Sequence, residues 1–102
     1  MEITTQKLGL KLVIKATGRI DAMTAVEYGT TINDLLDDSD DGVKELILDL
    51  AGIDYISSIG LRVLLELQKR MTNDGSMKLI NVAPSVMDVF NMTGFTGVLT
   101  IE

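Results

Sequence analysis

Cysteine and histidine are both absent from the 102 residues of this chain. The lack of cysteine excludes disulfides, zinc–thiolate sites and thiol nucleophiles. The lack of histidine excludes every triad, dyad or metal site built on imidazole, and it removes the commonest general base near neutral pH. The sequence also contains neither a Walker A motif nor a Gly-x-Gly-x-x-Gly motif. We therefore expect a protein that is not an enzyme, with no catalytic residue, no cofactor and no metal site.

Aromatic residues and proline are scarce as well: there are two Phe, two Tyr, no Trp and one Pro. Leu, Ile, Val and Met must therefore fill the core. They can do so, because apolar residues make up 46% of the chain and charged residues only 24%. These proportions are typical of a globular protein, and the length predicts a single domain at residues 1–102.

The chain has few positive charges: it contains nine Lys and Arg and fifteen Asp and Glu, which gives a net charge of -6. An acidic surface repels phosphate backbones and anionic headgroups, so we expect neither a nucleic-acid nor a membrane partner. The first residues lack the basic stretch and apolar core of a signal peptide, and no apolar run is long enough to span a membrane. We therefore expect a cytoplasmic protein.

Hydrophobic periodicity predicts alternating strands and helices. The expected strands are residues 2–7, 11–17, 46–50, 77–82 and 98–101, and the expected helices are residues 24–36, 58–73 and a segment from Pro84 to before Gly94. The order β-β-α-β-α-β-α-β predicts an α/β domain with a small mixed, largely parallel sheet and packed helices.

Three local patterns refine this prediction. Thr24 and Glu27 have the spacing of a capping box at the start of the first helix, and Gly75 suits a left-handed residue after the second. Lys11, Lys15 and Arg19 share one face of a strand, which we interpret as an ordinary solvated face in an acidic protein.

The polar loop at residues 37–42 resembles half of a calcium-binding loop. Asp37, Ser39 and Asp41 alternate before Gly42, but the twelfth position, where a bidentate Glu is needed, is Leu48. We interpret the segment as a solvated acidic loop without calcium.

The most informative stretch is residues 54–62, Asp-Tyr-Ile-Ser-Ser-Ile-Gly-Leu-Arg, between a buried strand and an amphipathic helix. One of Ser57 and Ser58 is expected to cap the helix, and that role alone would explain the pair. A helix start can also accept a phosphate, because its amides are unpaired and its dipole is positive there. Phosphorylation would add about -1.5 to -2 charges at this neutral site.

Five segments resemble STAS domains, and in particular bacterial anti-sigma factor antagonists, in their order and spacing. They are Gly18–Asp21, Leu46–Leu50, Tyr55–Leu61, Leu79–Val82, and Pro84 through Phe90 to Gly94. Together they extend over nearly the whole chain, which implies a single STAS domain.

The resemblance implies a binding protein of bacterial signalling that regulates transcription. The unphosphorylated antagonist binds an anti-sigma factor, usually a serine kinase, and so frees a sigma factor. The kinase releases the antagonist by phosphorylating a serine at the start of the second helix, and a phosphatase restores it. Aligned on Gly60 and Leu61, that serine falls on Ser58. The family's aspartate before the first helix falls on Asp21, which could equally be a helix cap.

The expected partner-binding residues are therefore Asp21, Ser57, Ser58, Ile59, Gly60 and Arg62. Many family members have an acidic residue where this chain has Ser57, and Ser or Thr where it has Ile59. Ser57 thus remains an alternative phosphorylation site. A STAS scaffold without a switch, as a subunit of a transporter or signalling assembly, and a nucleotide hydrolase remain the alternative functions. The oligomeric state is left open.

Overall fold

The chain opens with an antiparallel hairpin formed by β1 (Glu2–Leu8) and β2 (Lys11–Ile20). Gly9, between the strands, has φ +63°, a conformation that glycine adopts without strain. The structure, a computed structural model, describes residues 1–38 and 42–102. It confirms the predicted hairpin, although β2 continues three residues beyond the predicted end at Thr17.

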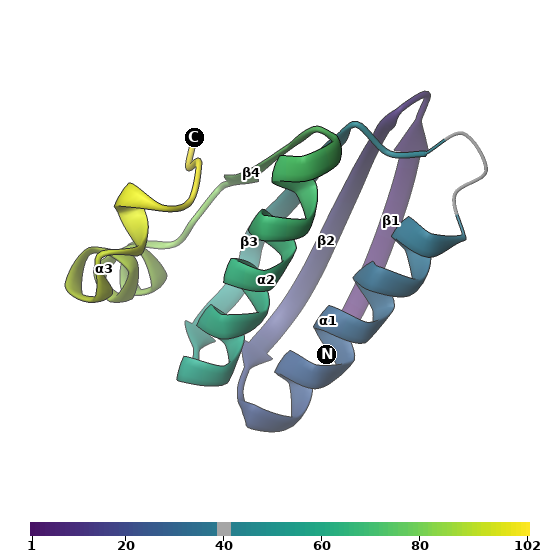
Figure 1. The fold of residues 1–102 in the computed structure, drawn as a ribbon. Coiled ribbons are helices and arrows are strands. Elements are labelled where there is room, and N and C mark those ends of the chain that lie inside the picture. Colours follow the sequence, from purple (N-terminus) through teal and green to yellow (C-terminus); the bar gives the residue numbers. More distant parts are fainter. Residues whose placement is uncertain (39–41) are drawn as a thin grey trace.

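The rest of the sheet is parallel. After β2 come α1 (Ala22–Asp37), β3 (Glu45–Ile56), α2 (Ser58–Asp74) and β4 (Ser76–Ile80), and the strands lie in the order β1-β2-β3-β4. Strands β2, β3 and β4 are parallel. The helices α1 and α2 lie beside each other on one face of this sheet (Figure 1). The predicted mixed, largely parallel sheet is therefore confirmed.

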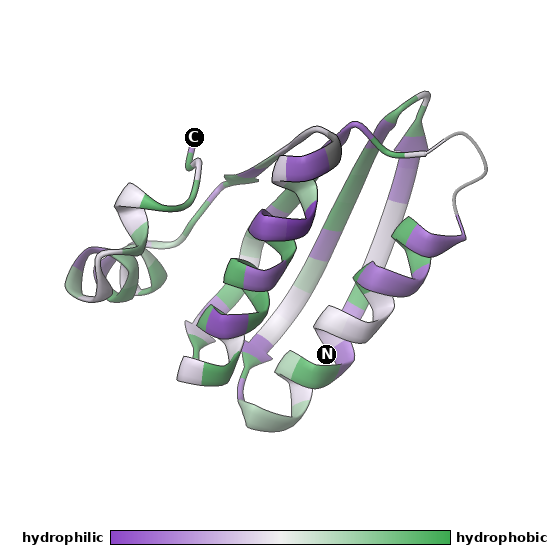
Figure 2. Ribbon diagram, viewed as in Figure 1, coloured by the Kyte–Doolittle hydropathy of each residue, from purple (hydrophilic) through white to green (hydrophobic). Residues whose placement is uncertain are grey.

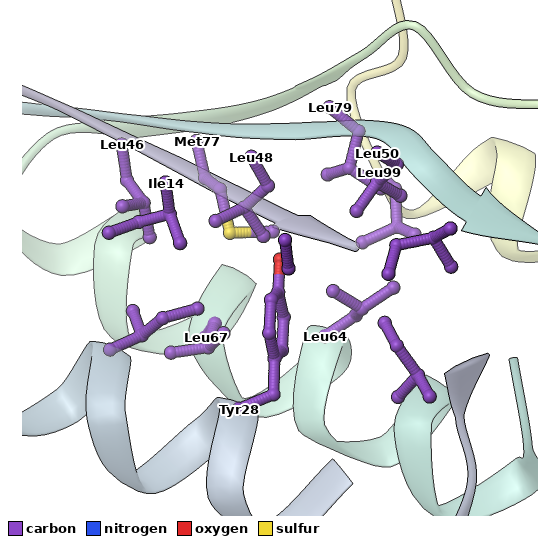
Figure 3. Close-up of a cluster of buried hydrophobic side chains, with 14 of the residues drawn as sticks. Ile14, Tyr28, Leu46, Leu48, Leu50, Leu64, Leu67, Met77, Leu79 and Leu99 are labelled. Atoms are coloured by element: carbon purple, nitrogen blue, oxygen red, sulfur yellow. The ribbon is translucent and has the colours of Figure 1, made fainter. Parts of the chain in front are cut away.

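The core lies between that face and the two helices. Alternate residues of the strands point into it, including Leu12 and Ile14 of β2 and Leu46 and Leu48 of β3. Figure 3 shows Ile14, Leu46 and Leu48 near Tyr28 of α1, whose ring points toward the sheet. Tyr28 is fully buried, and its hydroxyl has no hydrogen-bond partner among the described residues. Burial and the negative charge of Asp49 raise the pKa of this hydroxyl.

The helix α3 (Pro84–Thr93) begins with proline at a position that needs no amide donor, as predicted. It ends at Gly94, which has φ +80°, and a short 3-10 helix η1 (Phe95–Gly97) follows. The strand predicted at residues 98–101 is wrong. Only Ile101 forms a bridge, to Leu79, because η1 occupies the preceding residues and leaves too little extended chain.

Two further local predictions are wrong. The helix α1 starts at Ala22 and its N-cap residue is Asp21. Thr24 is the third helical residue and not the N-cap residue, so the predicted box of Thr24 with Glu27 is not formed. Gly75 is extended, with φ 174°, and not left-handed. A glycine is needed there for space, because a Cβ atom would overlap the carbonyl group of Lys44.

The acidic loop expected at residues 37–42 lies partly outside the described residues, since 39–41 are not among them. Its first member, Asp37, is the last residue of α1 and pairs with Arg70 of α2, with 2.6 Å between Oδ1 and Nη2. Within the described parts of the chain, no helix is long and apolar enough to cross a membrane.

Candidate partner-binding site

The starts of α1 and α2 meet at one end of the sheet. The strands β2 and β3 finish at Ile20 and Ile56, which are paired in the register. The backbone N–H of Ser57 donates to the carbonyl of Ile20 at 2.8 Å. Both helices therefore begin from adjacent strand ends (Figure 1). The expected site residues, which are distant in sequence, are brought to this end.

Asp21 caps α1. Its Oδ1 accepts from the backbone N–H of Thr24 at 2.9 Å and from that of Met23 at 3.0 Å. Thr24 completes a capping box, because its hydroxyl accepts from the backbone N–H of Asp21 at 2.8 Å. The Thr24 amide and hydroxyl, followed by the Met23 amide and the charge of Arg19, hold the pKa of Asp21 below its ordinary value of 3.8. The capping role of Asp21 is thus confirmed.

The two serines at the start of α2 have different surroundings. Ser57 is the cap, and its Oγ accepts from the backbone N–H of Gly60 at 3.1 Å. Ser57 is half-buried, whereas Ser58 is exposed and is the first helical residue. One serine therefore holds the helix start, and the hydroxyl of the other is accessible from solvent.

Gly60 lets α2 approach the strand ends. It is buried, and a Cβ atom there would stand 2.7 Å from Cγ2 of Ile20 and 2.7 Å from Cγ1 of Ile56. Gly60 is therefore a packing residue beneath the site. Ile59 is 42% exposed and Arg62 is also exposed, so both can contact a partner.

Exposed apolar residues extend this surface in a way that the sequence analysis missed. On α1, Met23 is 84% exposed and Val26 is 61% exposed. They are three apart and share the outer side of the helix. Figure 2 shows hydrophobic colour in the first turns of both helices at this end. The sequence contains a signal for this exposure, because Met23 and Val26 do not fall on the helix side that Ala25 and Tyr28 bury.

A shallow groove continues from Val26 between the two helices. It has a volume of about 230 Å³, and its lining residues are Val26, Gly29, Thr30, Asn33, Val63 and Glu66. Gly29 keeps the helices close, because a Cβ atom there would stand 3.0 Å from Cγ1 of Val63. Together, the exposed starts of α1 and α2 and this groove form the helix-start surface: Asp21, Met23, Val26, Ser58, Ile59, Arg62 and the groove residues.

An aromatic contact lies next to this surface. The guanidinium carbon of Arg19 is 4.2 Å from the ring centroid of Tyr55, a cation–π distance, and Tyr55 is 41% exposed. Arg19 and Tyr55 are paired in the register, one residue before Ile20 and Ile56. Positive charge is therefore held close to the cap of α1.

The chemistry of the site is that of recognition. No group of three acidic, His or Cys side chains suited to a metal ion occurs among the residues that the structure describes. At the helix starts themselves this surface offers the capped carboxylate of Asp21, the accessible hydroxyl of Ser58, the exposed Arg62 and apolar side chains, and the groove adds Thr30, Asn33 and Glu66. This set can bind a protein surface and can accept a modification at the hydroxyl.

Comparison with known proteins identifies the class. The model of the STAS domain family matches residues 2–102. The chain is 30% identical over 102 residues to BtrV of Bordetella bronchiseptica, which is proposed to be an anti-sigma factor antagonist; the alignment covers 99% of this chain and 85% of that protein. The chain therefore belongs to the STAS domain family, as the sequence analysis predicted.

Solved structures agree on the fold. An anti-sigma factor antagonist from Mycobacterium paratuberculosis is similar with a TM-score of 0.85 and 19% identity, covering 98% of this chain and 83% of that one. The anti-sigma factor antagonist SpoIIAA in its unphosphorylated form gives a TM-score of 0.81 at 17% identity, covering 99% and 88%. The phosphorylated form of SpoIIAA from Bacillus gives 0.73 at 16% identity, covering 99% and 91%.

Proposed function

We propose that this protein is an anti-sigma factor antagonist that binds an anti-sigma factor through the helix-start surface and is released when Ser58 is phosphorylated. The observation that carries the proposal is the exposed hydroxyl of Ser58 at the start of α2, beside exposed apolar residues. The similarity of the chain to BtrV and SpoIIAA supports an anti-sigma factor as the partner. We further propose that the partner is a serine kinase, with a phosphatase to reverse the reaction.

Ser58 fits the switch better than Ser57 for a geometric reason. Ser57 is half-buried and its Oγ accepts from the backbone N–H of Gly60, so modification there would disturb the cap. Ser58 is exposed, and no described residue makes a hydrogen bond to its side chain. A kinase could reach Ser58 without opening the helix.

The phosphate would act on the partner and not on the fold. Neither the cap nor the first turn of α2 carries an acidic side chain, so its partial positive charge can receive an added anion. In the complex, the same charge would lie among Met23, Val26 and Ile59, where desolvation and repulsion oppose binding. Phosphorylation would therefore weaken the complex and leave the antagonist folded.

Paired substitutions test this function. The wild-type protein and the variants Ser58→Ala and Ser58→Asp are immobilised and exposed to extract from the protein's own cells, and captured kinases are identified by mass spectrometry. The purified kinase is then titrated against each variant by calorimetry. We expect Ser58→Ala to bind like the wild type and Ser58→Asp to bind about tenfold or more weakly, because its carboxylate adds charge to an apolar interface.

Ser58→Asn is the matched control, because it has nearly the shape of Ser58→Asp and no charge. It should bind more tightly than Ser58→Asp. Equal affinities for Ser58→Asp and Ser58→Ala would contradict the switch. Binding that is insensitive to Met23→Ser and Ile59→Ser would place the partner on another surface.

A further inference from the structure

The sheet face opposite α1 and α2 carries an ordered pattern of charge. On β2 and β3, the residues that alternate with the buried core residues project from this open face. The register pairs them in three rows: Lys11 with Glu45, Val13 with Ile47, and Lys15 with Asp49. A basic column on β2 thus lies beside an acidic column on β3, with an apolar row in the middle.

The lysines of β2, Lys11 and Lys15, have no ion-pair partner in the described ranges 1–38 and 42–102. The carboxylate of Glu45 is 3.6 Å from Lys78 instead. Two lysines therefore stay available on a protein whose net charge is -6.

Asp49 can also accept a further hydrogen bond. Its Oδ1 accepts from the backbone N–H of Ala51 at 3.0 Å and from Nδ2 of Asn81 at 3.2 Å. Its Oδ2 accepts no hydrogen bond from the described part of the chain. A lysine from outside the chain could bind this second oxygen without displacing the existing contacts.

We propose that a second copy of this chain docks on the open face and forms a two-fold dimer, with the axis parallel to the strands and between β2 and β3. Such an axis places β2 of one copy over β3 of the other. Lys11 then faces Glu45, Val13 faces Ile47, and Lys15 faces Asp49 of the second copy. Every row is complementary to its own symmetry mate, and each contact occurs twice.

The shape of the face is compatible with this packing. Aligned sheets pack face to face at about 10 Å, with strands inclined by about 30°. The middle row is apolar, and Val13, which is half-buried, contributes more exposed surface there than Ile47, which is 6% exposed. A hollow of about 400 Å³ beside them, lined by Thr4, Thr5, Gln6, Val13, Lys15 and Asp49, gives room for side chains of the second copy.

The dimer does not depend on the proposed function. The helices α1 and α2 cover the other face of the sheet, so the helix-start surface stays open in each copy (Figure 1). The charged columns set the lateral position of the two copies, because a sideways shift that put β2 over β2 would place the lysines of one copy over those of the other. The dimer would present two switch sites.

Analytical ultracentrifugation of the full chain over a wide range of concentration tests the proposal. The wild-type protein should form a dimer at high concentration. Lys11→Glu and Glu45→Lys should each weaken self-association about tenfold or more, because each introduces two like-charge contacts. A one-to-one mixture of the two variants should recover the dimer, since the introduced charges then face each other.

Lys69→Glu is the matched control, because Lys69 is exposed on α2 and undergoes the same change of charge. It should dimerise like the wild type, and circular dichroism should show all three variants folded. A wild-type protein that is monomeric at every concentration overturns the proposal. So does a dimer that Lys11→Glu and Lys69→Glu affect equally, or a mixture that stays monomeric.

Discussion

The starts of α1 and α2 have the same backbone arrangement and different chemistry. Both follow neighbouring parallel strands, and both caps are extended, with φ -90° at Asp21 and φ -87° at Ser57. At α1 the cap is a carboxylate with two amide donors, and the backbone N–H of Asp21 makes the reciprocal bond to the hydroxyl of Thr24. At α2 the cap is a neutral hydroxyl with one bond, of 3.1 Å, from Gly60.

The difference shows where charge can be added. A helix start carries a partial positive charge of roughly half a unit. At α1, Asp21 already balances that charge and is tied to the backbone. At α2, neither the cap nor the first turn is acidic, so the positive end is unbalanced beside the exposed Ser58. One helix start is suited to hold structure, and the other to accept a phosphate.

The largest expected effect comes from separating α2 from the strand ends. Gly60→Ala would bring a Cβ atom to 2.7 Å from Ile20 and Ile56. We expect a loss of about 2–3 kcal/mol in the free energy of unfolding, because the packed core cannot give way cheaply. Urea denaturation measures the loss. Gly97→Ala, where no heavy atom lies within 4 Å of the added Cβ, is the control and should be nearly neutral.

The loss of stability on removing each cap should follow the number of hydrogen bonds that the cap makes. Asp21→Ala should cost about 1–2 kcal/mol and Ser57→Ala about 0.5–1 kcal/mol, because Asp21 takes part in the reciprocal box and Ser57 does not. Asp21→Asn keeps the capping oxygen and should cost little. Thermal unfolding of the three variants measures this order, and a larger cost at Ser57 would reverse the comparison.

The middle of α1 provides a contrast with its capped start. The hydroxyl of Tyr28 is buried among the residues in Figure 3 without a partner in the described chain. Tyr28→Phe removes that hydroxyl and should stabilise the protein by about 1 kcal/mol. The midpoint of thermal unfolding should rise by roughly 4–8 °C for a domain of this size. A lower midpoint would mean that the hydroxyl is satisfied in solution.

The smallest expected effect is the pH dependence of the α1 start. Because folding lowers the pKa of Asp21 below 3.8, the carboxylate stabilises the folded state above that pH. This contribution disappears as the pH falls through the folded-state pKa. The stability advantage of the wild type over Asp21→Asn should therefore shrink below pH 3.8, as measured by urea denaturation at several pH values. An advantage that grows in acid would contradict the pKa direction.

Much of the fold could be predicted from periodicity. The alternation of Leu12, Ile14 and Ala16 indicated the strand β2 and its buried face correctly. The sequence alone does not decide which residue caps α1, because Asp21 with Thr24 and Thr24 with Glu27 both have the three-residue spacing of a capping box. The choice depends on where β2 ends, and irregular pairing near Gly18 carries that strand on to Ile20.

The candidate site was predicted in part. The exposure of Ser58 and the capping by Ser57 follow the expectation that one serine caps the helix. The contribution of Met23 and Val26 was missed, because only the packing of α1 beside α2 brings the start of α1 to the same end of the sheet as Ser58. The need for Gly75 was also misassigned, since the contact with Lys44 joins residues far apart in sequence.

The measurement that tests the central claim most directly is phosphopeptide mass spectrometry of the protein recovered from its own cells. The tryptic fragment Glu45–Arg62 contains Ser57 and Ser58 and no other serine. The comparison of the two helix starts predicts phosphate on Ser58, lost in Ser58→Ala and kept in Ser57→Ala. A fragment that carries no phosphate under any growth condition, or carries it on Ser57, would contradict the account.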